Sequence, residues 1–243
     1  MSRTIRCAIV PLRAGRQTLE PEVARYLLRV HRLGQGDTFI AFDPEARIEA
    51  VATLVTDHPK APLCEIATPV AATLVSTLPV TLLQGLGKGD KVDRVVRDAT
   101  QLGVQRIVLV ETERSIPERS DKHRDKERRY VRIAVEAARQ SGRGDVPVLA
   151  GPESLESALE SVAGASMKLA FHASGDTGLR QSFSSRSPEP GSIAACIGPE
   201  GGFSEAELAQ LVRAGFLLVR LGPFILRTET AAIAALAAIA EYC

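Results

Sequence analysis

The sequence has few cysteines, with only four among its 243 residues, at Cys7, Cys64, Cys196 and Cys243. They lie far apart and form no C-x-x-C pair, and the four histidines do not cluster with them. These spacings exclude a disulfide framework and the usual zinc ligand sets, so no structural metal is expected. Cys196 lies between alanine and isoleucine in an apolar strand, which favours a core position over a role as nucleophile.

The sequence also lacks a long hydrophobic run. The opening MSRTIRCAIVPLRAG has no apolar segment of signal-peptide length. The longest apolar run, Ala231 to Ala240, is about half of a membrane span. We therefore expect a globular protein of the cytoplasm without a membrane partner. The hydrophobic content of 45% is enough for the core of one large domain or of two smaller ones.

The net charge is only +1, but the charges are unevenly distributed. Residues 1–36 contain seven arginines and two glutamates, whereas residues 37–79 contain more acidic than basic residues. An arginine-rich face suggests an anionic partner, and nucleic acid is the commonest one. A solvated surface without a partner is the alternative interpretation.

Up to about residue 70, short β-like runs alternate with glycine, proline and aspartate turn signals, which predicts a small β-rich domain. The runs are RCAIV, DTFIAF, RIEAVATLV and LCEIAT. A helix is predicted over residues 21–33, with Val23, Tyr26, Leu27 and Val30 on one face. The opposite face is basic and available to a partner, and it carries Arg25, Arg29 and Arg32.

From about residue 78, strands alternate with helices, which is typical of a mainly parallel sheet covered on both faces. The predicted strands include PVTLLQ, RIVLV, VPVL and MKLAF, and the predicted helices lie at 90–103, 125–140 and 154–162. The loop GLGKGD at 85–90 matches neither the Walker A pattern nor the dinucleotide-binding glycine pattern. Lys88 can contact a phosphate there, or it can simply be solvated at a helix start.

Two unusual glycine-containing loops follow apolar strands near the C-terminus. The first, IGPEGGFSEAEL at 197–208, has Ser204 and Glu207 at capping-box spacing, which predicts a strand, a glycine turn and a helix. Such a loop is either a tight connection or a ligand cradle at the carboxyl end of a parallel strand. The second, LGPFILRTETAA at 221–232, leads into an alanine-rich helix that Thr228 can cap. We expect the two loops to end neighbouring strands.

Together the two loops resemble the paired C-terminal motifs of the ribosomal RNA small subunit methyltransferase E family, which belongs to the SPOUT class. The segments GDKVDRVVRDATQLGV, ERS at 113–115 and EAARQSGR at 136–143 fall in the family's order and spacing. The resemblance implies an α/β protein with a PUA-like β-barrel that binds RNA over residues 1–72. It implies a SPOUT methyltransferase domain with a C-terminal trefoil knot over residues 73–243. The implied activity is methylation of N3 of a uridine in small-subunit (16S) ribosomal RNA by a homodimer that uses S-adenosylmethionine.

The resemblance also implies the residues of the site. The cofactor would be lined by Ile197, Gly198, Pro199, Gly201, Gly202, Leu221, Gly222, Ile225, Leu226 and Thr230. Arg227 would stabilise the uridine anion, with Glu200 and Glu229 as candidate proton acceptors. Alternatively, Glu200 orients its own loop, Glu229 complements a helix N-terminus, and positioning supplies the rate without a base. The candidate RNA contacts, each of which can also be a solvated side chain, are Arg6, Arg25, Arg29, Arg32, Lys88, Arg114, Gln140 and Arg143.

The sequence departs from the family pattern at several positions. Asp98 and Gln101 stand where lysine and glutamate are usual, His31 replaces a common leucine, and Phe224 replaces a frequent arginine. A guanidinium missing beside the expected cleft bears on RNA contact and substrate choice. Two other function classes are a noncatalytic RNA-binding or ribosome-assembly factor on the same fold and an NAD-dependent oxidoreductase, which the glycine spacing disfavours.

Overall fold

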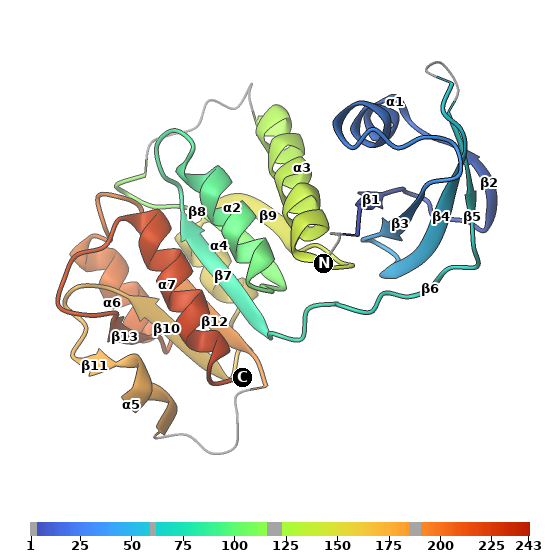
Figure 1. Cartoon of the computed structure of the whole chain (residues 1–243). Helices are drawn as coiled ribbons and strands as arrows, with labels where there is room; N and C mark the ends of the chain where they lie inside the picture. The colour runs from blue at the N-terminus through green and yellow to red at the C-terminus, as the bar shows by residue number, and fades with distance from the viewer. Residues whose placement is uncertain (1–3, 59–61, 116–122, 185–190) are drawn as a thin grey trace. The chain divides into compact units, whose positions relative to one another are not determined.

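The computed structural model describes residues 4–58, 62–115, 123–184 and 191–243 (Figure 1). Contacts divide the chain into two compact units. Unit 1 comprises Met1–Val75 and Val135–Val146, and unit 2 comprises Ser76–Ala134 and Pro147–Cys243. The second segment of unit 1 falls in the region that the sequence assigned to the second domain.

Two contacts explain why this segment belongs to unit 1. The Gly144 amide donates a hydrogen bond to the Leu74 carbonyl oxygen at 2.6 Å. The Arg139 guanidinium lies 3.6 Å from the centroid of the Tyr26 ring, a cation–π contact that binds the end of a long helix to the first seventy residues.

Unit 1 is built on a six-stranded sheet of order β1-β3-β4-β5-β2, with β6 paired to β4. The β1–β3 pair is parallel and the other pairs are antiparallel. The hydrogen-bonded path among the described strands does not return from β2 to β1, so the closed barrel expected for residues 1–72 is not observed. The elements are β1 (Arg6–Ala8), β2 (Gly15–Thr18), α1 (Pro21–Ala24), η1 (Arg25–Val30), β3 (Thr38–Asp43), β4 (Ile48–Thr56), β5 (Leu63–Ile66) and β6 (Val70–Ala71).

The helical segment of unit 1 is wound differently from the helix predicted over residues 21–33. Helix α1 passes directly into η1, a π-helical turn. In such a turn each amide bonds to the carbonyl five residues back, as His31 N does to Tyr26 O at 3.1 Å. The wider turn rotates later side chains away from the 3.6-residue pattern. Val30 and Leu27, predicted on one face of a regular helix, are therefore buried differently: Val30 is 63% exposed while Leu27 is fully buried.

Unit 2 is built on a seven-stranded sheet in which every pairing is parallel. The strand order is β11-β13-β10-β12-β7-β8-β9. All five residues of β12 are buried, as expected when both faces of a parallel sheet are covered. The strands are β7 (Val80–Gly85), β8 (Arg106–Glu111), β9 (Val148–Ser154), β10 (Met167–Phe171), β11 (Thr177–Gly178), β12 (Ile193–Ile197) and β13 (Leu217–Arg220).

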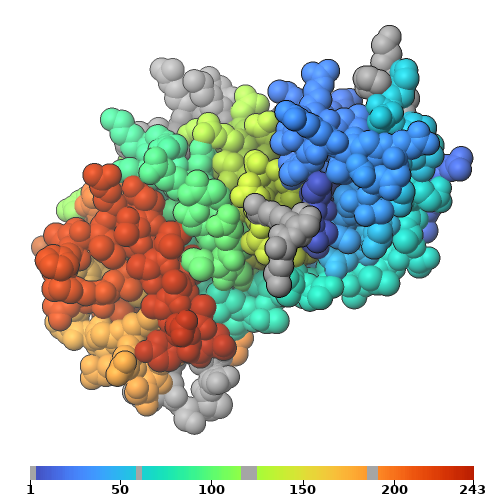
Figure 2. Space-filling model, in the orientation of Figure 1, coloured from blue at the N-terminus to red at the C-terminus, as the bar shows by residue number. Residues whose placement is uncertain are grey.

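Helices cover both faces of this sheet. Helix α2 packs against α7 on the face toward the viewer in Figure 1, and the C-terminal segment, in red, forms much of the visible surface of unit 2 in Figure 2. On the other face, α4 and α6 enclose a core cluster that includes Leu159, Leu211 and Cys196. The helices are α2 (Lys91–Gln101), α3 (His123–Ser141), α4 (Leu155–Ser161), α5 (Leu179–Ser184), α6 (Glu205–Arg213) and α7 (Thr228–Ala240).

Three cysteines are buried in the two cores, at Cys7, Cys64 and Cys196. Burial raises the pKa of Cys7 to about 11 and also raises the pKa of Cys196, to which the charge of Glu207 contributes. The prediction that Cys196 is a core residue rather than a nucleophile is confirmed. Within the described ranges, no group of three or more metal-ligating side chains is found, and no helix is long and apolar enough to cross a membrane.

Candidate functional site

The loops that follow β10, β12 and β13 line one cavity of about 580 Å³ in unit 2. The three strands are parallel, so their carboxyl ends lie at the same edge of the sheet, where α/β proteins bind ligands. The expectation that β12 and β13 are neighbours is wrong, because β10 lies between them. Consequently the cavity wall also contains residues that the sequence did not predict, namely Phe171, His172 and Ala173.

The loop after β12 is held in one shape by its own backbone and by α6. Gly202 has a φ of +68°, a conformation that L side chains rarely adopt. The predicted capping box is confirmed: Ser204 Oγ accepts from Glu207 N at 3.2 Å, and Glu207 Oε2 accepts from Ser204 N at 2.8 Å. Glu207 Oε1 also accepts from Glu113 N at 2.8 Å, which fixes the loop to the turn after β8.

Strand β7 approaches the same loop very closely. A Cβ atom added at Gly85 would lie 2.6 Å from the Pro199 nitrogen, so a side chain at this position requires the loop to move. The neighbouring buried Gln84 donates from Nε2 to Gly85 O and to Thr228 Oγ1, both at 3.0 Å. Thr228 in turn donates to Gly198 O at 2.6 Å. One hydrogen-bonded chain thus joins β7, the loop after β12 and the start of α7.

Helix α7 begins differently from expectation, because its N-cap is Arg227 and not Thr228. The Thr228 hydroxyl bonds to the loop after β12 instead of capping the helix. Thr228 lines the cavity, whereas Thr230 and Glu229 are not in its wall. The cofactor contact predicted for Thr230 and the proton transfer predicted for Glu229 therefore find no support in the cavity wall, which α7 lines with Thr228 and Ala231.

Glu200 is bound to the start of α2. Its Oε1 accepts hydrogen bonds from Lys88 N at 2.9 Å and from Lys91 Nζ at 2.5 Å. Burial raises the pKa of Glu200, but these two hydrogen bonds and the Lys91 charge outweigh it, and the pKa lies below its ordinary value. A carboxylate whose charged form is stabilised in this way is a weak proton acceptor. The geometry therefore favours the loop-orienting role of Glu200.

Arg114 supports the same loop from a neighbouring turn, and His172 stands in the cavity wall. Arg114 Nη1 donates to Gly201 O at 2.8 Å. The Ser174 amide donates to His172 Nδ1 at 3.2 Å, so the neutral ring carries its proton on Nε2. Partial burial and then the positive charge of Arg114 lower the pKa of His172. The neutral imidazole therefore prevails at pH 7 and can donate a hydrogen bond from Nε2.

The loop between β13 and α7 forms the outer wall of the cavity. Its apolar side chains are unusually exposed, with Phe224 at 82% and Ile225 at 88%. Arg227 is also exposed, and its guanidinium has no ion pair with another residue in the described part of the chain. The predicted wall residues Ile197, Gly198, Pro199, Gly201, Gly202, Leu221, Gly222, Ile225 and Leu226 all lie in this cavity.

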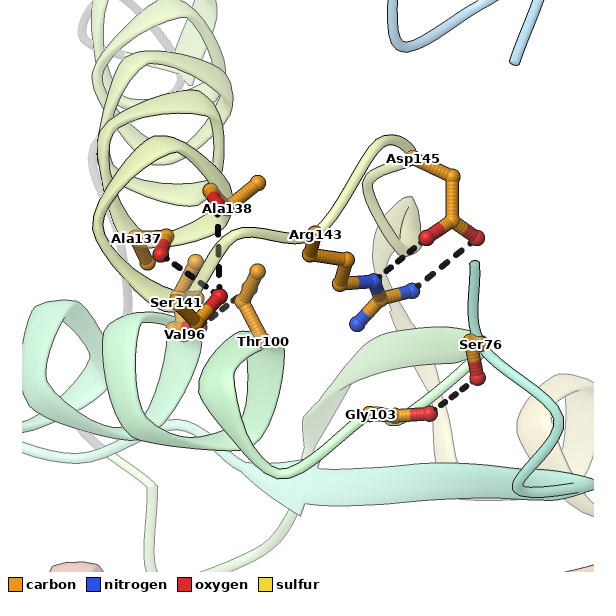
Figure 3. Close-up of polar contacts among 9 residues, drawn as sticks. All are labelled: Ser76, Val96, Thr100, Gly103, Ala137, Ala138, Ser141, Arg143 and Asp145. Carbon is orange, nitrogen blue, oxygen red and sulfur yellow. Dashed lines mark hydrogen bonds and ion pairs between the residues drawn. The ribbon is translucent and has the colours of Figure 1, made fainter. Parts of the chain in front are cut away.

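The residues predicted to contact RNA lie in both units, and two of them are held by acidic partners. Arg6 pairs with Glu49 at 2.8 Å, and its side chain is only 14% exposed. Arg143 is 6% exposed, and its guanidinium donates two hydrogen bonds to Asp145 (Figure 3). The prediction that Arg143 binds RNA is corrected accordingly, because its charge is buried and already paired. The others are exposed at the surface, namely Arg25, Arg29, Arg32, Lys88, Arg114 and Gln140.

Comparison with known proteins identifies the family of the chain. Residues 75–240 match the model of the RNA methyltransferase domain. Ribosomal RNA small subunit methyltransferase E of Bacillus subtilis is 31% identical over 223 residues, which cover 90% of this chain and 87% of the relative. The Synechocystis protein of the same name is 33% identical over 223 residues, which cover 91% of this chain and 72% of the relative.

Two solved structures are similar to nearly the whole chain. A Legionella pneumophila protein with its bound cofactor S-adenosylmethionine has a TM-score of 0.88 and 31% identity, covering 98% of this chain and 97% of that one. Ribosomal RNA small subunit methyltransferase E of Neisseria gonorrhoeae, bound to S-adenosylmethionine, has a TM-score of 0.86 and 30% identity with the same coverage. The sequence relatives and the cavity at the carboxyl ends of the parallel strands agree, and the chain belongs to the ribosomal RNA small subunit methyltransferase E family of RNA methyltransferases.

Proposed function

We propose that this protein methylates N3 of a uridine in small-subunit (16S) ribosomal RNA and uses S-adenosylmethionine as the methyl donor. The observation that carries the proposal is the cavity lined by the loops after β10, β12 and β13. Support comes from the similar structures, which bind S-adenosylmethionine, and from relatives named for small-subunit ribosomal RNA.

The cavity fits this cofactor in size and in chemistry. Its volume of about 580 Å³ lies within the roughly 300–1,000 Å³ typical of small-molecule sites. Glycines leave backbone amides and carbonyls open to the edge of an adenine, and apolar side chains such as Phe203 and Leu221 suit the faces of its ring. We assign to the cofactor the predicted wall residues of this cavity, with Thr228 in the place predicted for Thr230. When bound, S-adenosylmethionine supplies a methyl group activated by its sulfonium.

The acceptor nitrogen N3 of uridine carries a proton at neutral pH, so the protein must stabilise the anion that forms as the proton leaves. Arg227 lies in the cavity wall with an exposed guanidinium, and it is our candidate for this charge. Glu200 instead orients the loop after β12. Positioning of the two reactants can contribute about 7–11 kcal/mol, so a dedicated general base is not required.

The proposal also covers the RNA and the assembly. The RNA-binding domain spans residues 1–72, and it resembles a PUA-like domain because it consists mainly of β-strands. Its exposed arginines Arg25, Arg29 and Arg32 contact phosphates of the RNA. The methyltransferase domain spans residues 73–243, with its C-terminal segment threaded as a trefoil knot. The chain acts as a homodimer in the cytoplasm.

The experiment that tests the proposal is reverse transcription across ribosomal RNA from cells that lack the protein. Methylation at N3 blocks base pairing, so the polymerase stops at the modified uridine in wild-type RNA. We expect one stop to disappear in the deletion strain and to return with the wild-type gene but not with Arg227→Ala. Unchanged stops would refute the assigned reaction. Binding of RNA without any methyl transfer would favour the noncatalytic RNA-binding factor.

A further inference from the structure

One aromatic ring of the cavity wall is largely exposed. The structure describes all seven phenylalanines and all three tyrosines, and Phe224 is the only one of these that is largely exposed, at 82%. The other rings are buried or half-buried. Phe224 lies between β13 and α7, in a loop that forms part of the cavity wall. An exposed ring at the mouth of a site is placed to contact what enters it.

The positive charge near this ring indicates which kind of molecule it can bind. Arg220 and Arg227 flank the loop and are exposed, whereas Lys91 in the same cavity wall is paired with Glu200. Basic groups of this kind bind phosphates, whereas an aromatic face binds the flat surface of a base. A site that combines both is suited to single-stranded RNA, whose unstacked bases are recognised by stacking on aromatic side chains.

We propose that Phe224 is a specificity-determining residue on which a nucleobase of the RNA substrate stacks, beside the uridine that enters the cavity. The inference rests on the proposed function and adds to it an RNA contact by a residue of the cavity wall to which no cofactor contact is assigned. Loss of one stacked base weakens RNA binding by roughly 5- to 140-fold. The effect falls on the KM for RNA and not on cofactor binding, because the ring is at the rim.

The sequence offers a direct test, since it contains no tryptophan. Phe224→Trp introduces a single indole at the proposed platform. We expect a short single-stranded RNA of mixed sequence to quench its fluorescence and S-adenosylmethionine alone to leave it unchanged. The matched control is Val212→Trp, which places the single tryptophan at a position that is 53% exposed on α6 and outside the cavity wall. We expect RNA to quench the control much less.

Three fluorescence results would overturn the inference. Equal quenching of the two variants would mean that RNA does not select the ring. Quenching by S-adenosylmethionine alone would mean that the ring covers the cofactor. A change in emission with protein concentration in the absence of RNA would mean that a second copy of the chain covers it.

Kinetics provide an independent readout. We expect Phe224→Ala to raise the KM for RNA by about 10-fold, with kcat and cofactor affinity little changed, and we expect Phe224→Tyr to restore the wild-type KM. An unchanged KM for Phe224→Ala would overturn the inference. A failure of the proposed function is distinguishable. If the wild-type protein transfers no methyl group to uridine, the fluorescence of the Phe224→Trp variant still reports whether RNA stacks on this position.

Discussion

Thr228 donates a hydrogen bond to the carbonyl oxygen of Gly198 at 2.6 Å, and this bond joins the start of α7 to the loop after β12. The same hydroxyl accepts from Gln84 Nε2 at 3.0 Å, so a third segment is attached to it. Thr228 is 5% exposed and Gln84 is 1% exposed, so water cannot readily replace either partner. The relative position of both cavity walls therefore depends on one buried hydroxyl.

Replacement of this hydroxyl by a methyl group tests its role. Thr228→Val keeps the shape of the side chain but leaves Gly198 O and Gln84 Nε2 without their partner. We expect a loss of about 1–3 kcal/mol in the free energy of unfolding and weaker binding of S-adenosylmethionine. Chemical denaturation and calorimetric titration measure the two effects. Thr230→Val is the control, since that residue is exposed outside the wall, and an equal effect of both variants would contradict the interpretation.

Glu200 provides a test of loop orientation against proton transfer. If it orients the loop, Glu200→Gln retains an oxygen that accepts from Lys88 N and changes kcat only a few-fold, whereas a general base contributes about 10²–10⁴-fold. Glu200→Ala removes both hydrogen bonds and raises the KM for S-adenosylmethionine. Steady-state kinetics of the two variants decide between the roles. If Glu200→Gln lowers kcat by as much as removal of a general base does, Glu200 is the proton acceptor after all.

The lowered pKa of Glu200 also predicts how stability varies with pH. The folded state favours the charged carboxylate, so the contribution of Glu200 is complete above its ordinary pKa of 4.5. It disappears as the pH falls through the lower pKa of the folded state. We therefore expect the difference in unfolding free energy between wild type and Glu200→Gln to be constant from pH 7 to about pH 5 and to shrink at lower pH. A difference that grows on acidification would contradict the ion pair with Lys91.

Much of the local structure could be predicted from the sequence, because periodicity and capping are local signals. The capping box of Ser204 and Glu207 and the end of α2 near Gly103, whose φ is +86°, are confirmed. The order of strands in the sheet is not a local property. Nothing in the sequence indicates that β10 lies between β12 and β13, and for that reason His172 was not predicted as a residue of the cavity wall. Its only sequence cue is its position directly after the apolar run MKLAF.

Side-chain roles were harder to predict than elements, because they depend on which partners the fold brings within reach and on whether it buries the pair. Thr228 is a residue type that often caps helices, but its hydroxyl donates a hydrogen bond to Gly198 O, thirty residues away. Arg143 lies in a motif that resembles an RNA-contacting segment, yet Asp145 pairs with it in the interior. The carbonyl bound by Thr228 could not be chosen from spacing, because every residue between the two loops offers one. Asp145 is the acidic residue nearest to Arg143 in the sequence, but nothing in the spacing indicated that the fold buries this pair.

The buried Arg143–Asp145 pair predicts a structural phenotype for a residue once expected to bind RNA. Arg143→Ala leaves the carboxylate of Asp145 buried without this partner, and we expect it to destabilise the fold by about 3–5 kcal/mol. The double variant Arg143→Ala with Asp145→Ala should be less destabilised than the single one. Arg29→Ala, at an exposed site, should instead weaken RNA binding with little change in stability. An Arg143→Ala protein of wild-type stability and reduced RNA affinity would reverse this assignment.

If Arg227 stabilises the uridine anion, its replacement should lower the rate of methyl transfer without weakening cofactor binding. We expect Arg227→Ala to lower kcat by about 10²–10³-fold, as removal of one oxyanion donor does, while the affinity for S-adenosylmethionine changes little. Arg227→Lys should recover only part of the rate, because the ammonium group lacks the planar fork of the guanidinium. Arg213→Ala, at an exposed position on α6 outside the cavity wall, is the control for a general loss of positive charge. Equal losses in Arg227→Ala and Arg213→Ala would exclude a specific role in stabilising the uridine anion.

Gly85 tests whether the close approach of β7 sets the shape of the cavity. A methyl group at this position would lie 2.6 Å from the backbone nitrogen of Pro199, which no rotamer change can relieve. Gly85→Ala must therefore displace the loop after β12, and we expect binding of S-adenosylmethionine to weaken by at least about 10-fold, a change of about 1.4 kcal/mol. Gly164→Ala is the matched control, because nothing lies within 4 Å of its added Cβ. Calorimetric titration of both variants measures the effect. If Gly85→Ala binds the cofactor as tightly as Gly164→Ala, the loop after β12 does not form the binding wall, and the assignment of Gly198 and Pro199 to the cofactor fails with it.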